Sequence, residues 1–177
     1  MNDQLYIDAL LDGLQTPRDE LATARRICGF PETEGRFGPL TSILGEIGRA
    51  GKGKQFAPGV LSLAEESVFA SGAEEGNTAA WRDETRRALD QLRAAFKDNP
   101  DSPAYRYTLY HFLHAYGARV AYGGEGEARD TSWFDRNRVL AAVASCLDRN
   151  DGQAEFLLLK GAVSGIQKSI HHNIGAE

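Results

Sequence analysis

The sequence predicts an all-α protein of about eight helices in antiparallel pairs, arranged as a helical bundle or a short solenoid. Apolar residues recur at the 3.6-residue spacing of amphipathic helices through most of the 177 residues. No segment shows the period-two alternation of a half-buried strand, and β-branched residues are spread through the helical patterns. Segments that contain glycine and proline separate the periodic stretches, as loops between helices do.

The first half of the chain is expected to hold four short helices. Their apolar residues are, in order, Ile7, Leu10, Leu11 and Leu14; Leu21, Ala24 and Cys28; Leu40, Ile43, Leu44 and Ile47; and Val60, Leu61, Ala64 and Val68. Thr16 and Pro17 suit the N-cap and first position of the second helix, and Gly29 suits its end. Residues 29–39 and 48–59 are rich in glycine and proline and are expected to form loops.

The second half is expected to hold four longer helices. Capping residues mark where three of them begin: Asn77, Ser102 before Pro103, and Thr131 or Ser132. The sixth helix is expected to run to about Ala121, and residues 123–130 form a polar loop. The eighth helix follows Asp151 and Gly152.

The chain is expected to form a single helical domain over residues 1–177, with a looser N-terminal part over 1–72 packed on a helical core over 76–174. Apolar residues make up 42% and charged residues 25%, as in globular proteins. The net charge of −5 disfavours nucleic acid, and the apolar runs are too short to span a membrane. The absence of signal-peptide features and the two distant cysteines favour a cytoplasmic protein with reduced thiols.

Residues 88–113 carry a pattern of small and large apolar residues that resembles the junction between two tetratricopeptide-type helical repeats. The matching residues are Ala88, Leu92 and Ala95 in one helix, Pro100 after it, and Leu109 and Leu113 in the next. Arg106, Tyr110 and Tyr122 depart from the family's pattern. The resemblance covers residues 88–121, with an echo over 139–170, and implies a helical scaffold that binds a protein or peptide without catalysis.

The motifs of nucleotide binding and catalysis are incomplete. Gly48, Gly53 and Lys54 follow the order of a phosphate-binding loop, but Gln55 stands where a serine or threonine hydroxyl would hold magnesium. The charges of residues 82–93 are mixed in sign, which indicates a solvated helix face with internal ion pairs.

Histidines are the candidates for metal binding. His111 and His114 lie one helical turn apart, and His171 and His172 are adjacent. A full site needs one or two further ligands, and the sequence contains no recognised metal motif to supply them. We therefore favour no metal and expect no cofactor.

One face of the sixth helix is the candidate site. Each residue turns by about 100° around a helix axis, which places a core stripe on one side. That stripe consists of Tyr105, Leu109, Phe112, Leu113, Tyr116 and Val120. Tyr107, Tyr110, His111 and His114 share the other side, and aromatic rings with polar tips suit an interface or a partly wet pocket. A central helix covered on both sides would explain these residues equally well.

Two classes of function follow from these observations. The favoured one is a noncatalytic helical interaction module that binds a protein or peptide through this face. The alternative is a small helical enzyme or ligand-binding protein, with or without a metal, whose pocket lies beside residues 103–121.

Overall fold

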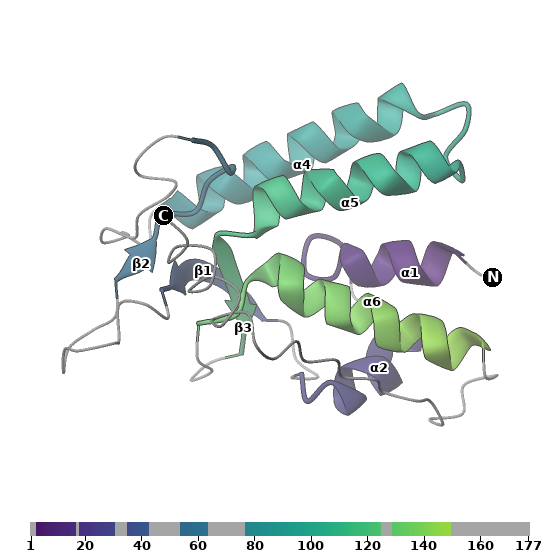
Figure 1. The fold of residues 1–177 in the computed structure, drawn as a ribbon, viewed down its shortest axis with the longest axis horizontal. Helices are drawn as coiled ribbons and strands as arrows, with labels where there is room; N and C mark the ends of the chain where they lie inside the picture. The colour runs from purple at the N-terminus through teal and green to yellow at the C-terminus, as the bar shows by residue number, and fades with distance from the viewer. Residues whose placement is uncertain are drawn as a thin grey trace, which may run out of the picture.

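The computed structural model describes residues 3–16, 18–30, 35–42, 54–63, 77–124 and 129–149, which combine helices with a small antiparallel sheet (Figure 1). The helices are α1 (Asp3–Leu10), the 3-10 helix η1 (Asp19–Leu21), α2 (Ala22–Ile27), α4 (Asn77–Ala95), α5 (Pro103–Gly117) and α6 (Trp133–Arg149). The strands are β1 (Arg36–Thr41), β2 (Gln55–Phe56) and β3 (Val120–Gly123). The fold is mixed helix and sheet, so the predicted all-α architecture of about eight helices is wrong.

β1 is the central strand of the sheet, whose order is β2–β1–β3 with both pairings antiparallel. The sequence predicts a loop here because Gly38 and Pro39 usually interrupt strands. In the structure, the guanidinium of Arg129 occupies the place that a Cβ on residue 38 would take. Pro39 is buried opposite Val120 of β3. Both residues therefore serve close packing of the strand instead of a turn.

β3 lies where the sequence predicts the last turn of the sixth helix. The preceding helix α5 ends at Gly117, where a Cβ would lie 2.5 Å from the ring of Trp133. The chain then turns, and residues 120–122 are buried as they pair with β1. A strand of four residues that is buried on both faces has no alternating pattern, so local periodicity could not reveal it.

The three long helices of the second half are confirmed, and two begin with the caps that the sequence predicts. The Ser102 hydroxyl accepts a hydrogen bond of 3.1 Å from the Tyr105 amide, and Pro103 takes the first helical position. At α6, the Ser132 hydroxyl accepts from the amide of Asp135 at 3.0 Å and donates to its carboxylate at 2.8 Å. This reciprocal capping fixes where α6 begins.

The predicted helices of the first half agree less well with the structure than those of the second half do. Gly29 ends α2 as predicted, with a positive φ of 69°. The preceding 3-10 turn begins at Asp19 and not at Thr16, and residues 60–63 are not helical. The predicted segments at 43–47 and 64–68, the glycine-rich run at 48–53, the eighth helix, Pro17, His171 and His172 lie outside the described residues.

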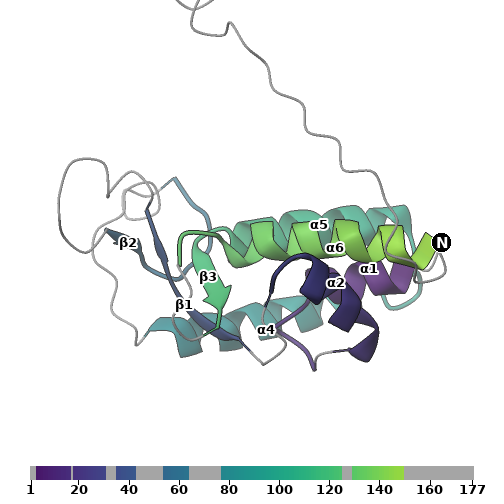
Figure 2. The same ribbon diagram turned by 90° about the horizontal axis from the view of Figure 1, so that it is seen from below.

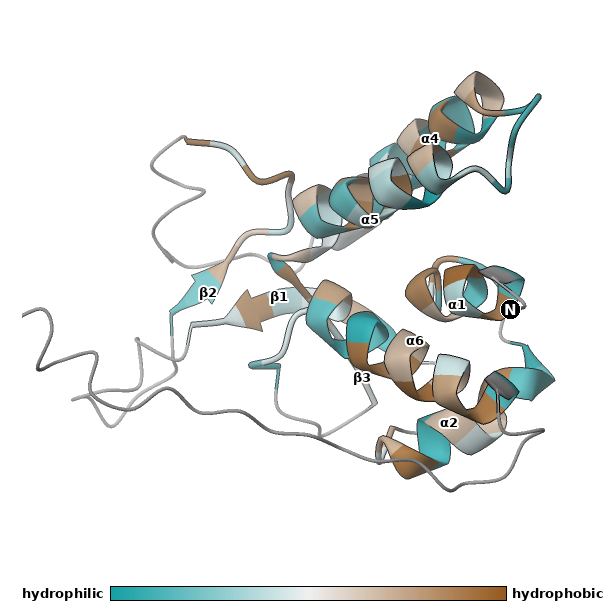
Figure 3. Ribbon diagram, turned by 45° about the vertical axis from the view of Figure 1, so that its right-hand side comes forward, coloured by the Kyte–Doolittle hydropathy of each residue, from teal (hydrophilic) through white to brown (hydrophobic). Residues whose placement is uncertain are grey.

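In the view of Figure 2, α5 and α6 lie on one side of the helical part and α4 on the other, and the sheet lies at the end where α4 and α6 begin and α5 ends (Figures 1 and 2). Hydrophobic and hydrophilic residues both run along α4 and α6 (Figure 3), as expected for helices that cover a core on one side. An aromatic cluster joins sheet and helices, because the Phe37 ring lies 5.0 Å from Trp81 and 4.7 Å from Tyr122. Among the described residues, no helix has the length and apolar composition to cross a bilayer.

Candidate functional site

The residues predicted as the site lie on the solvent side of α5. Tyr107 is 69% exposed, His111 and His114 are exposed, and Tyr110 is half-buried. The opposite stripe of α5 is in the core, where Tyr105, Leu109 and Leu113 are buried. The two faces of α5 therefore differ as the sequence indicates, and the described fold does not cover both sides of this helix.

The predicted residues form a continuous set of ring contacts that extends onto α6. The His111 ring lies 4.3 Å from the Tyr107 ring and 5.6 Å from the Tyr110 ring. Phe134 of α6 continues the set, with its ring 5.1 Å from Tyr110 and 4.9 Å from His114. Phe134 is itself 4% exposed and supports the exposed rings from the core side. Together with Arg138, these residues form what we call the aromatic surface: Tyr107, Tyr110, His111, His114, Phe134 and Arg138.

Arg138 is the cation of the aromatic surface, and three neighbours hold it. Its side chain hydrogen-bonds with Tyr110, which raises the pKa of Arg138, and its guanidinium carbon lies 5.7 Å from the centre of the Phe134 ring. An ion pair of 3.1 Å links it to Asp135, one turn earlier on α6. Because the side chain is 53% exposed, its charge remains accessible to a partner.

The position of the aromatic surface follows from how α5 meets α6. Gly117 allows the end of α5 to approach Trp133 at the start of α6, since any side chain there would strike the indole. The Ser132 cap sets the helical phase of α6, so Trp133 points into the core and is fully buried. Phe134, one residue later, is turned by about 100° and meets Tyr110 and His114.

The predicted histidine pair does not gather a metal site in the described fold. His111 packs against two tyrosines, whereas His114 packs against Phe134. Within the described residues, no group of three or more His, Cys, Asp or Glu side chains is placed to hold a metal ion.

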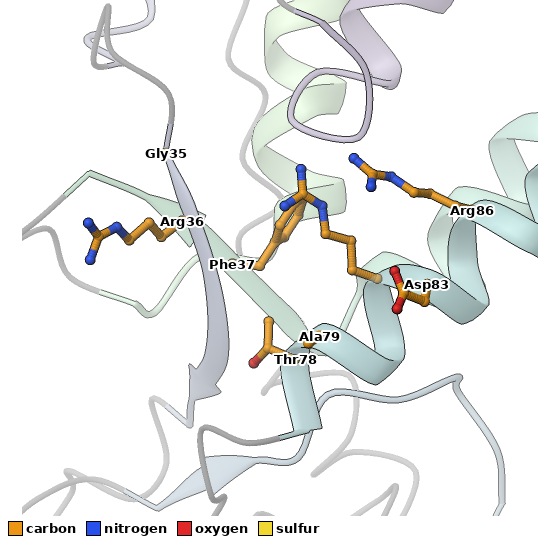
Figure 4. A pocket seen from close by; sticks show the side chains of 8 residues that line it. Gly35, Arg36, Phe37, Thr78, Ala79, Asp83 and Arg86 are labelled. Carbon is orange, nitrogen blue, oxygen red and sulfur yellow. The ribbon is translucent and has the colours of Figure 1, made fainter.

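Sequence reasoning missed a pocket between β1 and the first half of α4, with a volume of about 640 Å³ (Figure 4). Its charged lining residues are Arg36 from β1 and Arg82, Asp83 and Arg86 from α4, and Phe37 forms part of its wall. Arg82 and Arg86 lie four residues apart and share a helix face. This spacing is the one feature of the local sequence that indicates a cluster of arginines. The pocket needs β1 beside α4, and the sequence did not predict that strand.

A buried ion pair was also missed. Asp12 follows α1 and is 5% exposed, and its carboxylate accepts hydrogen bonds from Arg25, one of them 3.4 Å long. The backbone carbonyl of Asp12 accepts from Trp133 at 2.7 Å and from Asn137 at 2.8 Å. The carboxylate and the carbonyl of Asp12 therefore hold the end of α1 against α2 and α6, which is a structural role.

Cys28 lies at the end of α2 and is half-buried. Burial raises the pKa of its thiol, and the nearby charge of Arg136 lowers it by a smaller amount. The neutral thiol is therefore favoured, whereas a nucleophilic cysteine needs its thiolate.

Comparisons of the chain with protein-family models, with curated proteins and with solved structures find no match. The resemblance to tetratricopeptide repeats stays a prediction. Its proline, Pro100, lies between α4 and α5. The Trp81 indole donates to the carbonyl of Tyr116 at 2.8 Å, and this bond ties the start of α4 to the end of α5.

Proposed function

We propose that the chain is a noncatalytic interaction module that binds a protein or peptide through the aromatic surface. The observation that supports it is the continuous set of ring contacts across α5 and α6, which carries an exposed tyrosine and two exposed histidines. Tyrosine and arginine are enriched where proteins bind one another. Rings that already pack against each other lose less conformational entropy on binding, which favours affinity.

The charge of the aromatic surface indicates the chemistry of its partner. Arg138 offers donors to solvent, and it already pairs with the carboxylate of Asp135. We propose a partner segment that sets a carboxylate against Arg138 and an apolar side chain against Tyr107 and His111. The planar guanidinium can bind a second carboxylate because it has five donors.

The proposal includes a reducing compartment, such as the cytoplasm. Cys28 and Cys146 are both free and half-buried. Reduced thiols of this kind are usual in cytosolic proteins, where disulfides are rare.

The double substitution His111→Ala and His114→Ala tests the proposal. Peptides are first selected from a random display library on the parent chain, and their affinities for each variant are then measured by fluorescence polarisation. We expect the double variant to bind about tenfold or more weakly, because it removes both imidazole rings and their three ring contacts. Its melting temperature should stay close to that of the parent, since both side chains are exposed.

The matched control is Glu84→Ala with Gln91→Ala, two exposed residues of α4 that lie outside the aromatic surface. This variant should bind the selected peptides as the parent does. Equal binding by the histidine variant, or a library that enriches no peptide on the parent, would reject the aromatic surface as the binding site.

A further inference from the structure

The pocket between β1 and α4 has the composition of an anion site. Its four charged residues comprise three arginines and one aspartate, whereas the whole chain has a net charge of −5. Positive charge is thus gathered in a hollow of an acidic protein. Such a cluster of positive charge raises the local concentration of anions.

Contacts to the rest of the fold hold the pocket arginines on α4 in place. Arg86 donates to the backbone carbonyl of Leu14 at 3.3 Å, which directs its side chain toward the segment after α1. The guanidinium carbon of Arg82 lies 5.6 Å from the centre of the Phe37 ring. Arginines that are already oriented lose less entropy when they bind an anion.

The β1 side of the pocket is rigid as well. The amide of Gly35 donates to the Tyr122 hydroxyl at 3.1 Å, and Arg36 pairs with Gly123 in the sheet register. Figure 4 shows Arg86 reaching from α4 toward the centre of the view, whereas Arg36 extends to the other side of β1. The two α4 arginines are therefore the expected anion ligands, and Arg36 adds charge at the edge.

We propose that this pocket binds a small organic phosphate, whose phosphate group lies between Arg82 and Arg86 and whose organic part packs on Phe37. The guanidinium group fits the oxygen atoms of a phosphate through paired hydrogen bonds. A volume of about 640 Å³ is in the range of small-molecule sites and would leave most of its space empty around a bare phosphate ion. Phe37 supplies the apolar wall that a ring or chain on the ligand needs.

A purely structural role of the two arginines makes a different prediction. Arg82 lies over the ring of Phe37, which contacts Trp81 and Tyr122, and it could serve only to cover that ring. In that case no anion would bind with preference at the pocket. The charge of Arg82 could then be removed with an effect on stability alone.

The test measures binding of three probes to the whole chain by two-dimensional NMR titration and calorimetry: phenyl phosphate, inorganic phosphate and phenol. We expect phenyl phosphate to bind saturably and about tenfold more tightly than either fragment, because only it combines charge with a ring. Chemical shifts of Phe37, Thr78 and Arg82 should move, while those of His111 on the aromatic surface stay in place. No saturable binding of phenyl phosphate would overturn the proposal.

Arg82→Gln should weaken phenyl phosphate binding by about tenfold to a hundredfold, as expected for the loss of a charge-assisted hydrogen bond. Arg87→Gln is the control, because Arg87 is an exposed arginine on the same helix that does not line the pocket. If both variants bind equally well, the pocket is not the site. If Arg82→Gln fails to fold, the same comparison is made with Arg86→Gln. The chemical-shift changes of the parent chain then show independently whether phenyl phosphate binds at the pocket.

Discussion

Two neighbouring residues of α6 show how one helix serves both the core and the surface. Asn137 is 1% exposed and donates to the backbone carbonyls of Leu10 at 3.0 Å and Asp12 at 2.8 Å. Arg138 has a side chain that is 53% exposed and contacts Asp135 and two residues of the aromatic surface, Tyr110 and Phe134. Asn137 fixes a backbone, whereas Arg138 presents a charge to solvent.

The difference separates two kinds of polar group. On the buried side, Asn137 and Arg25 each donate to a buried oxygen at the end of α1, so the loss of either side chain deprives that oxygen of a donor. On the exposed side, water replaces any lost hydrogen bond. Stability should therefore depend on the buried residues and binding on the exposed ones.

The largest loss of stability is expected for Arg25→Ala. Asp12 would keep a buried carboxylate without its ionic partner, which costs about 3–5 kcal/mol in the free energy of unfolding. Arg93→Ala is the matched control: Arg93 pairs with Asp90 at 3.8 Å, and the two side chains are exposed, by 43% and 76%. We expect a loss of about 1 kcal/mol or less there. The free energies of unfolding are measured by urea denaturation. Equal losses for the two variants would contradict the distinction between buried and exposed polar groups.

A smaller loss is expected for Asn137→Ala than for Arg25→Ala. The carbonyl of Leu10 would lose its Asn137 donor, while the carbonyl of Asp12 keeps the bond from Trp133, so we expect a cost of about 1–3 kcal/mol. Arg138→Ala, one residue later, should change the free energy of unfolding by about 0.5 kcal/mol or less. Thermal unfolding of both variants measures the difference, and a larger loss for Arg138→Ala would mean that the aromatic surface is part of the core.

The smallest effect is expected at Cys28, which is neither fully buried nor exposed. Burial raises the pKa of its thiol in the folded chain, so the folded state holds this proton to higher pH than the unfolded state does. The stabilisation is complete below the unfolded pKa of about 8.5 and declines as pH rises through the folded value. We expect the free energy of unfolding to fall as pH rises above the unfolded pKa of about 8.5, and Cys28→Ala to reduce this decline. An unchanged slope in Cys28→Ala would assign the decline to other groups.

Local sequence signals were sufficient for the long helices. Asn77–Ala95, Pro103–Gly117 and Trp133–Arg149 combine several turns of apolar periodicity with capping residues, and both features act within one segment. The strands were missed because their stability comes from distant partners. Phe37 pairs with Tyr122 of β3, and the sequence around Phe37 does not indicate which distant segment it will pair with.

The candidate sites also contain residues that local sequence could identify and residues that only distant contacts bring together. Tyr107, His111 and His114 share a helix face, so their common exposure could be inferred from spacing alone. Phe134 and Arg138 join them only because Gly117 and Trp133 bring α6 against α5. The arginine pocket requires β1, and the glycine and proline in this strand led the sequence analysis to predict a loop.

The hydrogen bonds between Asn137 and the end of α1 also bear on synthesis of the chain. A separation of 125 residues divides Asn137 from Asp12. At about 5–20 residues per second, a ribosome needs roughly 6–25 s to make that stretch. During this interval α1 has already emerged, and its apolar residues Ile7, Leu10 and Leu11 lack the helix that later covers them. The nascent α1 is therefore a segment that a chaperone is expected to hold.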